Sequence, residues 1–179
     1  PLIKVTIVPR GQSLGAAWYL PEERSITTTE QILDEMCATM GGRAAEQVVF
    51  GNISTGALSD LEKVSKQAQA MVKIYGLNDK IGNVSYYDSS GQQEYSFQKP
   101  YSEKTAELID KEISETIEFQ YKRAQQILTD NREKLDALAK MLLEKEVIFK
   151  DDLETIFGKR KFDEELTPIE IAPETATQE

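Results

Sequence analysis

Residues 54–64 read STGALSDLEKV, a loop of small residues that runs into the start of an amphipathic helix. Ser59 and Glu62 have the spacing of a capping box, in which two side chains satisfy free N–H groups at a helix start. Asp60 then lies in the first turn, where a carboxylate interacts favourably with the helix dipole. These contacts alone explain an aspartate at this position, and nothing nearby in the sequence demands that it bind a ligand.

Helical patterns extend upstream of this stretch and beyond it. Beyond Asp60, apolar residues recur at helical spacing up to Gly76, which is placed to end the helix. Upstream, Thr28 and Gln31 form a capping-box pair before another helical pattern. Gly41 and Gly42 interrupt that pattern, which predicts either a break or the close approach of another backbone, and close packing is the commoner reason.

The second half of the chain predicts two long helices. The first covers roughly residues 102–128, and Asp130 and Glu133 can cap the second, which carries Leu135, Leu138 and Leu142. Their short connection favours antiparallel packing. A short helix at residues 151–158 follows. Residues 77–100 read as a long irregular loop with a short strand at NVSYY.

The N-terminal residues predict a β-hairpin. Residues 2–11, LIKVTIVPRG, alternate apolar Ile3, Val5 and Ile7 with polar residues, and residues 16–21, AAWYLP, supply a second extended segment. The predicted fold class is therefore mainly α (α+β), a helical domain with a small N-terminal hairpin and a C-terminal pair of long helices. Residues 161–179 are rich in acidic residues, Pro and Thr and predict a disordered acidic tail.

Composition excludes several kinds of function. The net charge of −10 argues against a nucleic-acid surface, which needs clustered Lys and Arg. No apolar run approaches the roughly 20 residues of a membrane span, so we expect no crossing by this chain itself. The chain has no histidine, which rules out a Ser-His-Asp unit and a complete histidine-based zinc site within it. Its one cysteine, Cys37, falls on an apolar helix face and predicts a small core residue.

Four segments in order carry a family resemblance: LIKVTIVPRG, LGAAWYLP, GGRAAEQVVFG and STGALSDLEKVSKQAQAMV. Together they closely resemble the peptidase domain of FtsH-type AAA+ zinc metalloproteases, over residues 1–160. In that family two histidines of a His-Glu-x-x-His helix bind zinc, and a third ligand comes from a TGA-x-x-D segment. The resemblance implies that Asp60, in TGALSD, is that metal ligand. It also implies that Glu46, which by itself reads as a helix-surface charge, lies beside the zinc site and orients a ligand histidine.

The resemblance also implies what this chain lacks. The His-Glu-x-x-His helix, with its catalytic glutamate, precedes the matching position in the family, so the isolated chain is expected to be inactive. The family further implies Zn²⁺ in the full-length enzyme, ATP on an AAA+ module, a homohexamer, and membrane attachment through upstream segments on the cytoplasmic side of the bacterial inner membrane. The resemblance also implies that the substrates of the full-length enzyme are unfolded or tagged proteins.

Two further expectations follow. Strand residues Val5, Thr6 and Ile7 are expected to present a sheet edge near the active site, where an extended substrate adds as a strand. The alternative function is a non-catalytic helical domain for oligomerisation or scaffolding, derived from the same family.

Overall fold

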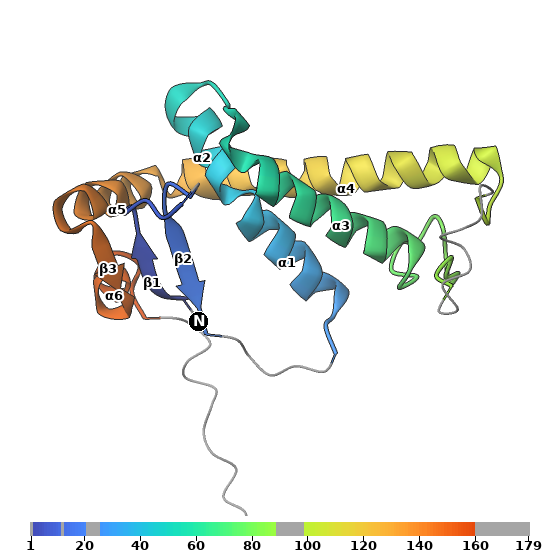
Figure 1. Cartoon of the computed structure of the whole chain (residues 1–179), viewed down its shortest axis with the longest axis horizontal. Coiled ribbons are helices and arrows are strands. Elements are labelled where there is room, and N and C mark those ends of the chain that lie inside the picture. Colours follow the sequence, from blue (N-terminus) through green and yellow to red (C-terminus); the bar gives the residue numbers. More distant parts are fainter. Residues whose placement is uncertain (1, 12, 21–25, 89–98, 160–179) are drawn as a thin grey trace, which may run out of the picture. The chain divides into compact units, whose positions relative to one another are not determined.

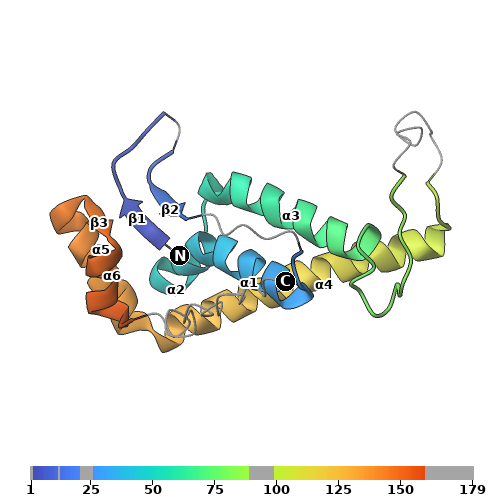
Figure 2. The same ribbon diagram turned by 90° about the horizontal axis from the view of Figure 1, so that it is seen from below.

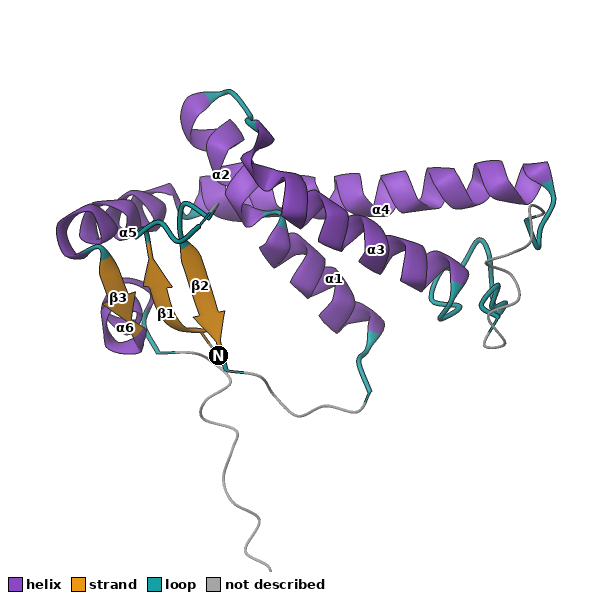
Figure 3. Cartoon of the chain, viewed as in Figure 1, coloured by secondary structure: helices purple, strands orange, loops and turns teal. Residues whose placement is uncertain are grey.

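The computed structural model describes residues 2–11, 13–20, 26–88 and 99–159. The chain divides into two compact units, which we call the sheet unit (residues 1–22 and 133–179) and the helical unit (residues 23–132). Helices dominate the described chain and the strands form one small sheet, so the predicted fold class is confirmed (Figure 3). Residues 161–179, the predicted acidic tail, lie outside the described residues.

The sheet unit holds a three-stranded antiparallel sheet in the order β2-β1-β3 (Figure 1). Strands β1 (Leu2–Thr6) and β2 (Ala16–Tyr19) form the predicted hairpin. Strand β3 (Val147–Phe149) was not predicted, and it pairs with the other side of β1, Val5 lying opposite Ile148. Helices α5 (Arg132–Lys145) and α6 (Lys150–Phe157) flank β3 in sequence.

The central position of β1 corrects the predicted sheet edge. Val5 and Thr6 are paired on both sides, and the N–H of Ile7 donates to the carbonyl of Glu146 at 3.1 Å. The backbone groups that a substrate strand would need are therefore already bonded within the chain. The predicted strand addition at Val5, Thr6 and Ile7 is wrong for this arrangement, because β3 occupies that edge.

A strained turn fixes the third strand. Glu146 follows α5 with φ of 60°, a left-handed conformation that is uncommon for residues other than glycine. Its N–H donates to the carbonyl of Leu142 at 2.8 Å, as in an αL helix end. Its own carbonyl accepts from both the Ile7 N–H and the Thr6 hydroxyl, the latter at 2.9 Å. Thr6 is consequently buried, whereas Ile3 and Ile7, which the alternation marks as the apolar face, are exposed.

The helical unit contains α1 (Thr29–Thr39), α2 (Gly41–Phe50), the 3-10 turn η1 (Thr55–Ala57), α3 (Leu58–Lys73) and α4 (Glu103–Asp130). Helices α1, α2 and α3 all contact α4, and Figure 2 shows α1 and α3 lying beside it. Their shared core takes residues from each of these four helices and includes the predicted buried cysteine. Its buried members are Met36, Cys37, Met40, Ala44, Val64, Ala68, Met71 and Ala124.

The helix boundaries follow local rules where the side chains cap them. Thr28 and Gln31 form the predicted capping box, with Thr28 N–H donating to Gln31 Oε1 at 2.9 Å. Of the two explanations left open for the glycine pair, the structure shows a break, since α1 ends at Thr39 and α2 begins at Gly41. A Cβ at Gly41 or Gly42 would meet open space among the described residues, so close packing does not explain the pair there.

Other boundaries differ from expectation. Helix α3 ends at Lys73, so Tyr75, predicted on its buried face, is exposed. Residues 83–87 form no strand. Helices α4 and α5 belong mainly to different units, so their antiparallel packing stays a prediction. None of the described helices is long and apolar enough to span a bilayer.

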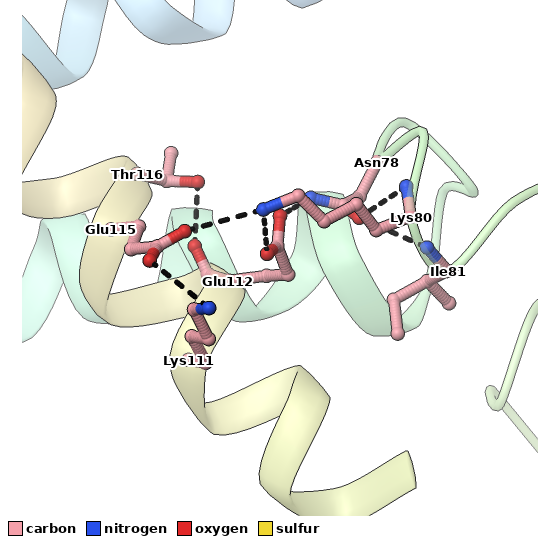
Figure 4. A network of polar contacts seen from close by, with 7 residues as sticks. All are labelled: Asn78, Lys80, Ile81, Lys111, Glu112, Glu115 and Thr116. Carbon is pink, nitrogen blue, oxygen red and sulfur yellow. Dashed lines mark hydrogen bonds and ion pairs between the residues drawn. The ribbon is translucent and has the colours of Figure 1, made fainter.

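A polar network holds the loop after α3 to the middle of α4 (Figure 4). Glu112, only 6% exposed, accepts hydrogen bonds from Asn78 Nδ2 at 2.9 Å and Lys80 Nζ at 2.5 Å. The Asn78 side-chain oxygen in turn accepts from the backbone N–H groups of Lys80 and Ile81. Hydrogen bonds from Asn78 and then Lys80 lower the pKa of Glu112. The network therefore orders residues 78–81 around one buried carboxylate.

Replacing Glu112 with alanine is expected to destabilise the chain by about 1–3 kcal/mol, because it leaves the Asn78 side-chain amide without its carboxylate acceptor and Lys80 with only the exposed Glu115. Urea denaturation followed by circular dichroism measures the change. Glu115→Ala is the matched control, since Glu115 lies on the same helix and binds Lys80 from an exposed position. Equal losses for the two variants would contradict the assignment of the buried carboxylate as the main anchor.

The same network predicts a pH dependence. Because the folded-state pKa of Glu112 is lowered, its contribution is fully present above the unfolded pKa of about 4.3 and is lost as pH falls through the folded pKa. The stability difference between the wild type and Glu112→Gln should therefore shrink as the solution is acidified from neutral pH. Denaturation curves over this range test it, and an unchanged difference down to about pH 2 would contradict it.

Candidate metal-ligand site

Asp60 lies in the first turn of α3, as predicted, and is partly buried. Its carboxylate makes no hydrogen bond or ion pair with any other described residue. By contrast Glu62, two positions further on, binds Lys66 at 2.5 Å. Asp60 thus has both carboxylate oxygens available for a cation. Its place in the first turn of α3 fixes the position of its backbone.

The predicted capping box of Ser59 and Glu62 is wrong. Helix α3 begins at Leu58 directly after η1, so its N-cap is Ala57 and no side chain caps it. The cap lies one turn earlier, where Ser54 Oγ accepts from the N–H of Gly56 at 3.2 Å. The chain is already wound as a 3-10 turn before α3 starts, which places Ser59 inside the helix.

Glu46 reaches from α2 to the loop that leads to Asp60. Its Oε2 accepts from the backbone N–H of Ser54 at 2.8 Å, and its Oε1 accepts from the Ser54 hydroxyl at 2.7 Å. These bonds, the hydroxyl first, lower the pKa of Glu46. The loop can return to α2 because Gly51 ends that helix in a left-handed conformation with φ of 67°. Glu46 is therefore more than a helix-surface charge.

Ser54 is a site residue that the sequence reasoning missed. The signal available was a serine just before the turn residues Thr55 and Gly56, which is a common helix N-cap pattern. Its bond to Glu46 carries no such signal, because the two residues are eight positions apart across a helix end. We call the set formed by Glu46, Ser54 and Gly56 the loop clasp.

The described residues alone offer few metal ligands. No group of three or more Asp, Glu, Cys or His side chains gathers anywhere in residues 2–11, 13–20, 26–88 and 99–159. Cys37 lies in the core, where burial raises the pKa of its thiol, so it is poorly suited to act as a thiolate ligand. Zinc in a catalytic site takes three protein ligands and keeps one position open. Asp60 fits as one such ligand.

Comparison with known proteins identifies the class. The family model of peptidase family M41 matches residues 1–156. An ATP-dependent zinc metalloprotease FtsH of Parabacteroides distasonis is 62% identical over 160 residues, covering 89% of this chain and 23% of that protein. The mitochondrial inner membrane m-AAA protease component AFG3L2 of Mus musculus is 44% identical over 177 residues, or 99% of this chain and 22% of that protein.

The fold and these matches define a mainly helical domain of a peptidase family. This chain belongs to peptidase family M41, which confirms the resemblance to FtsH-type proteases. A plant relative, ATP-dependent zinc metalloprotease FTSH 10, mitochondrial, of Arabidopsis thaliana, is 49% identical over 163 residues, 90% of this chain and 20% of that protein. The chain spans about a quarter or less of the length of these relatives.

Asp60→Asn should change the stability of the metal-free chain by no more than about 1 kcal/mol, because only its interaction with the helix dipole is lost. Urea denaturation measures the change in the free energy of unfolding. Glu62→Gln, which also replaces a carboxylate on the same helix, is the control. A loss of several kcal/mol from Asp60→Asn would show that the carboxylate has a structural partner. It would contradict the finding that the carboxylate bonds to no other described residue.

Proposed function

We propose that this chain is the C-terminal part of a membrane-anchored, ATP-dependent zinc metalloendopeptidase that degrades unfolded or tagged proteins. Membership of peptidase family M41 supports the reaction class. The observation that carries the assignment of the site is the carboxylate of Asp60 at the start of α3, which makes no hydrogen bond or ion pair with another described residue.

In this function Asp60 supplies one oxygen ligand to Zn²⁺. Zinc accepts an Asp oxygen at about 2.0–2.2 Å, and when bound it polarises a substrate carbonyl and lowers the pKa of water. Since this chain has no histidine, the imidazole ligands and the glutamate that activates water come from a His-Glu-x-x-His segment outside it. The part played by this chain is to hold one ligand and the loop behind it.

Glu46 is assigned to the surroundings of the same metal. Its role in orienting a ligand histidine stays a proposal, supported by the capacity of each carboxylate oxygen to accept more than one hydrogen bond. Its bonds to Ser54 leave lone pairs for a further donor.

The remaining parts of the proposal concern the full-length protein. They are a homohexamer, ATP bound to an AAA+ module, and attachment through upstream segments to the cytoplasmic side of the bacterial inner membrane. The names of the relatives, which include ATP-dependent and mitochondrial inner membrane proteases, support the use of ATP and the attachment to a membrane.

The chain as given should bind no stoichiometric zinc and cleave no peptide, because one or two carboxylates without imidazole hold zinc poorly. Joined to the upstream His-Glu-x-x-His segment, the protein should bind one zinc and hydrolyse casein. In that longer protein Asp60→Asn should lower zinc affinity and hydrolysis by at least about 10-fold, while Glu62→Gln leaves both unchanged. Metal analysis and casein cleavage measure these effects.

Tight one-to-one zinc with chelator-sensitive cleavage by the histidine-free chain would contradict this proposal. A full-length Asp60→Asn protein with wild-type zinc content would remove Asp60 from the ligand set. A full-length protein that binds no zinc and cleaves nothing would favour the non-catalytic scaffold alternative.

A further inference from the structure

We propose that Glu46 is a positioning residue for Asp60, acting through Ser54: the loop clasp fixes the turn from which α3 starts and thereby the place of the zinc ligand. This inference rests on the proposed function, in which Asp60 binds zinc. It assigns Glu46 a second task besides any contact with a ligand histidine, and it adds Ser54 to the site.

The contacts between Glu46 and Ser54 form a two-point hold. One carboxylate oxygen accepts a hydrogen bond from the backbone N–H of Ser54 at 2.8 Å, and the other accepts one from the Ser54 hydroxyl at 2.7 Å. Hydrogen bonds to an ionised carboxylate are shorter and stronger than bonds between neutral groups. Two bonds in different directions fix the orientation of Ser54 as well as its distance from α2.

The hold passes from Ser54 to Asp60 through the turn. Having donated its hydrogen to Glu46, the Ser54 hydroxyl still accepts from the N–H of Gly56 at 3.2 Å, which caps η1. Turn η1 runs directly into α3, and Asp60 is the third residue of that helix. The turn contacts both α2 and α3. A shift of Ser54 therefore moves the first turn of α3.

No other side chain in the described part of the unit duplicates this hold. Between α2 and residues 53–57, the side-chain hydrogen bonds among described residues are the two made by Glu46. A Cβ added at Gly56 would lie 3.3 Å from Ser54 Oγ, so the close approach of this residue to the Ser54 hydroxyl favours glycine there. The start of α3 is without a side-chain cap of its own. The clasp is thus the local constraint on where α3 begins.

Precise placement matters for a metal ligand. Ligand distances in working sites fall within about 0.2 Å of ideal values, and residues that orient ligands typically change metal affinity by about 10–100-fold when they are removed. A loosened turn would leave Asp60 chemically intact but poorly placed. Loss of the clasp should therefore weaken zinc binding without removing the ligand.

The test uses the full-length protein with four variants. Ser54→Ala removes the hydroxyl, Glu46→Ala removes the carboxylate, and a double variant carries both changes. Ser54→Thr keeps a hydroxyl at the same place and serves as the conservative control. Zinc affinity is measured by competition with a chromophoric chelator, the visible spectrum of the Co²⁺-substituted protein reports ligand geometry, and hydrogen exchange at the Gly56 N–H of the metal-free protein reports the turn.

The clasp predicts about a 10-fold or greater loss of zinc affinity in Ser54→Ala, an altered Co²⁺ spectrum and faster exchange at Gly56. Glu46→Ala should lose at least as much affinity. The double variant should be little weaker than Glu46→Ala, because both changes break one linked interaction. Ser54→Thr should bind zinc nearly as the wild type does.

Wild-type zinc affinity and an unchanged Co²⁺ spectrum in Ser54→Ala would overturn the inference, even if Glu46→Ala is impaired, since Glu46 would then act by another route. Fully additive losses in the double variant would overturn it as well. Failure of the underlying function looks different, because then Asp60→Asn itself would leave zinc binding unchanged. Should Ser54→Ala fold poorly, Ser54→Gly removes the same hydroxyl and provides the same comparison.

Discussion

The packing of three helices against α4 is the constraint on which the candidate site depends. Met36 of α1, Val64 of α3 and Ala124 of α4 belong to one buried cluster, and apolar contacts of α3 from residue 61 to residue 71 set the axis of that helix. Such close-packed contacts leave little freedom for the helix to slide or rotate. The core thus fixes the direction of α3, and the loop before it determines where along that direction Asp60 stands.

The carboxylates of the helical unit separate into groups with different physical roles. Glu112 is buried and fully engaged by Asn78 and Lys80, which is a structural arrangement. Glu62 and Glu35 form exposed ion pairs with lysines, which contribute little to stability. Asp60 fits neither group, because it is partly buried and makes no hydrogen bond or ion pair within the part of the chain that the structure describes. A negative charge kept at a helix start without a partner is consistent with a ligand position.

Local rules predicted much of this molecule. The capping box of Thr28 and Gln31, the interruption at Gly41 and Gly42 and the extent of α4 all depend on residues within a few positions of one another. Position 60 was also found locally, although its chemistry came from the family resemblance. These features need no knowledge of the tertiary fold, which explains why they could be read from the sequence.

The features that the sequence did not predict depend on contacts outside these local patterns. Strand β3 has three residues between two helices and exists because β1, more than a hundred residues earlier, pairs with it. The burial of Thr6 depends on the carbonyl of Glu146. Glu146 has a left-handed backbone, but it is not a glycine, so its residue type carries no sign of this conformation. The hydrogen bond that Ser54 donates to Glu46 joins a residue of α2 to the loop after that helix ends. Periodicity and capping patterns do not register contacts of this kind.

The discontinuous sheet also bears on the order in which the chain can fold during synthesis. The helical unit is continuous in sequence, whereas the sheet unit needs residues from both ends. Translation makes the N-terminal part first, at about 5–20 residues per second. The β1–β2 hairpin must therefore wait, with one side of β1 unpaired, until residues 147–149 emerge. An unpaired strand side is a site for wrong association. Until β3 emerges, the nascent hairpin thus exposes a strand side on which such wrong association can start.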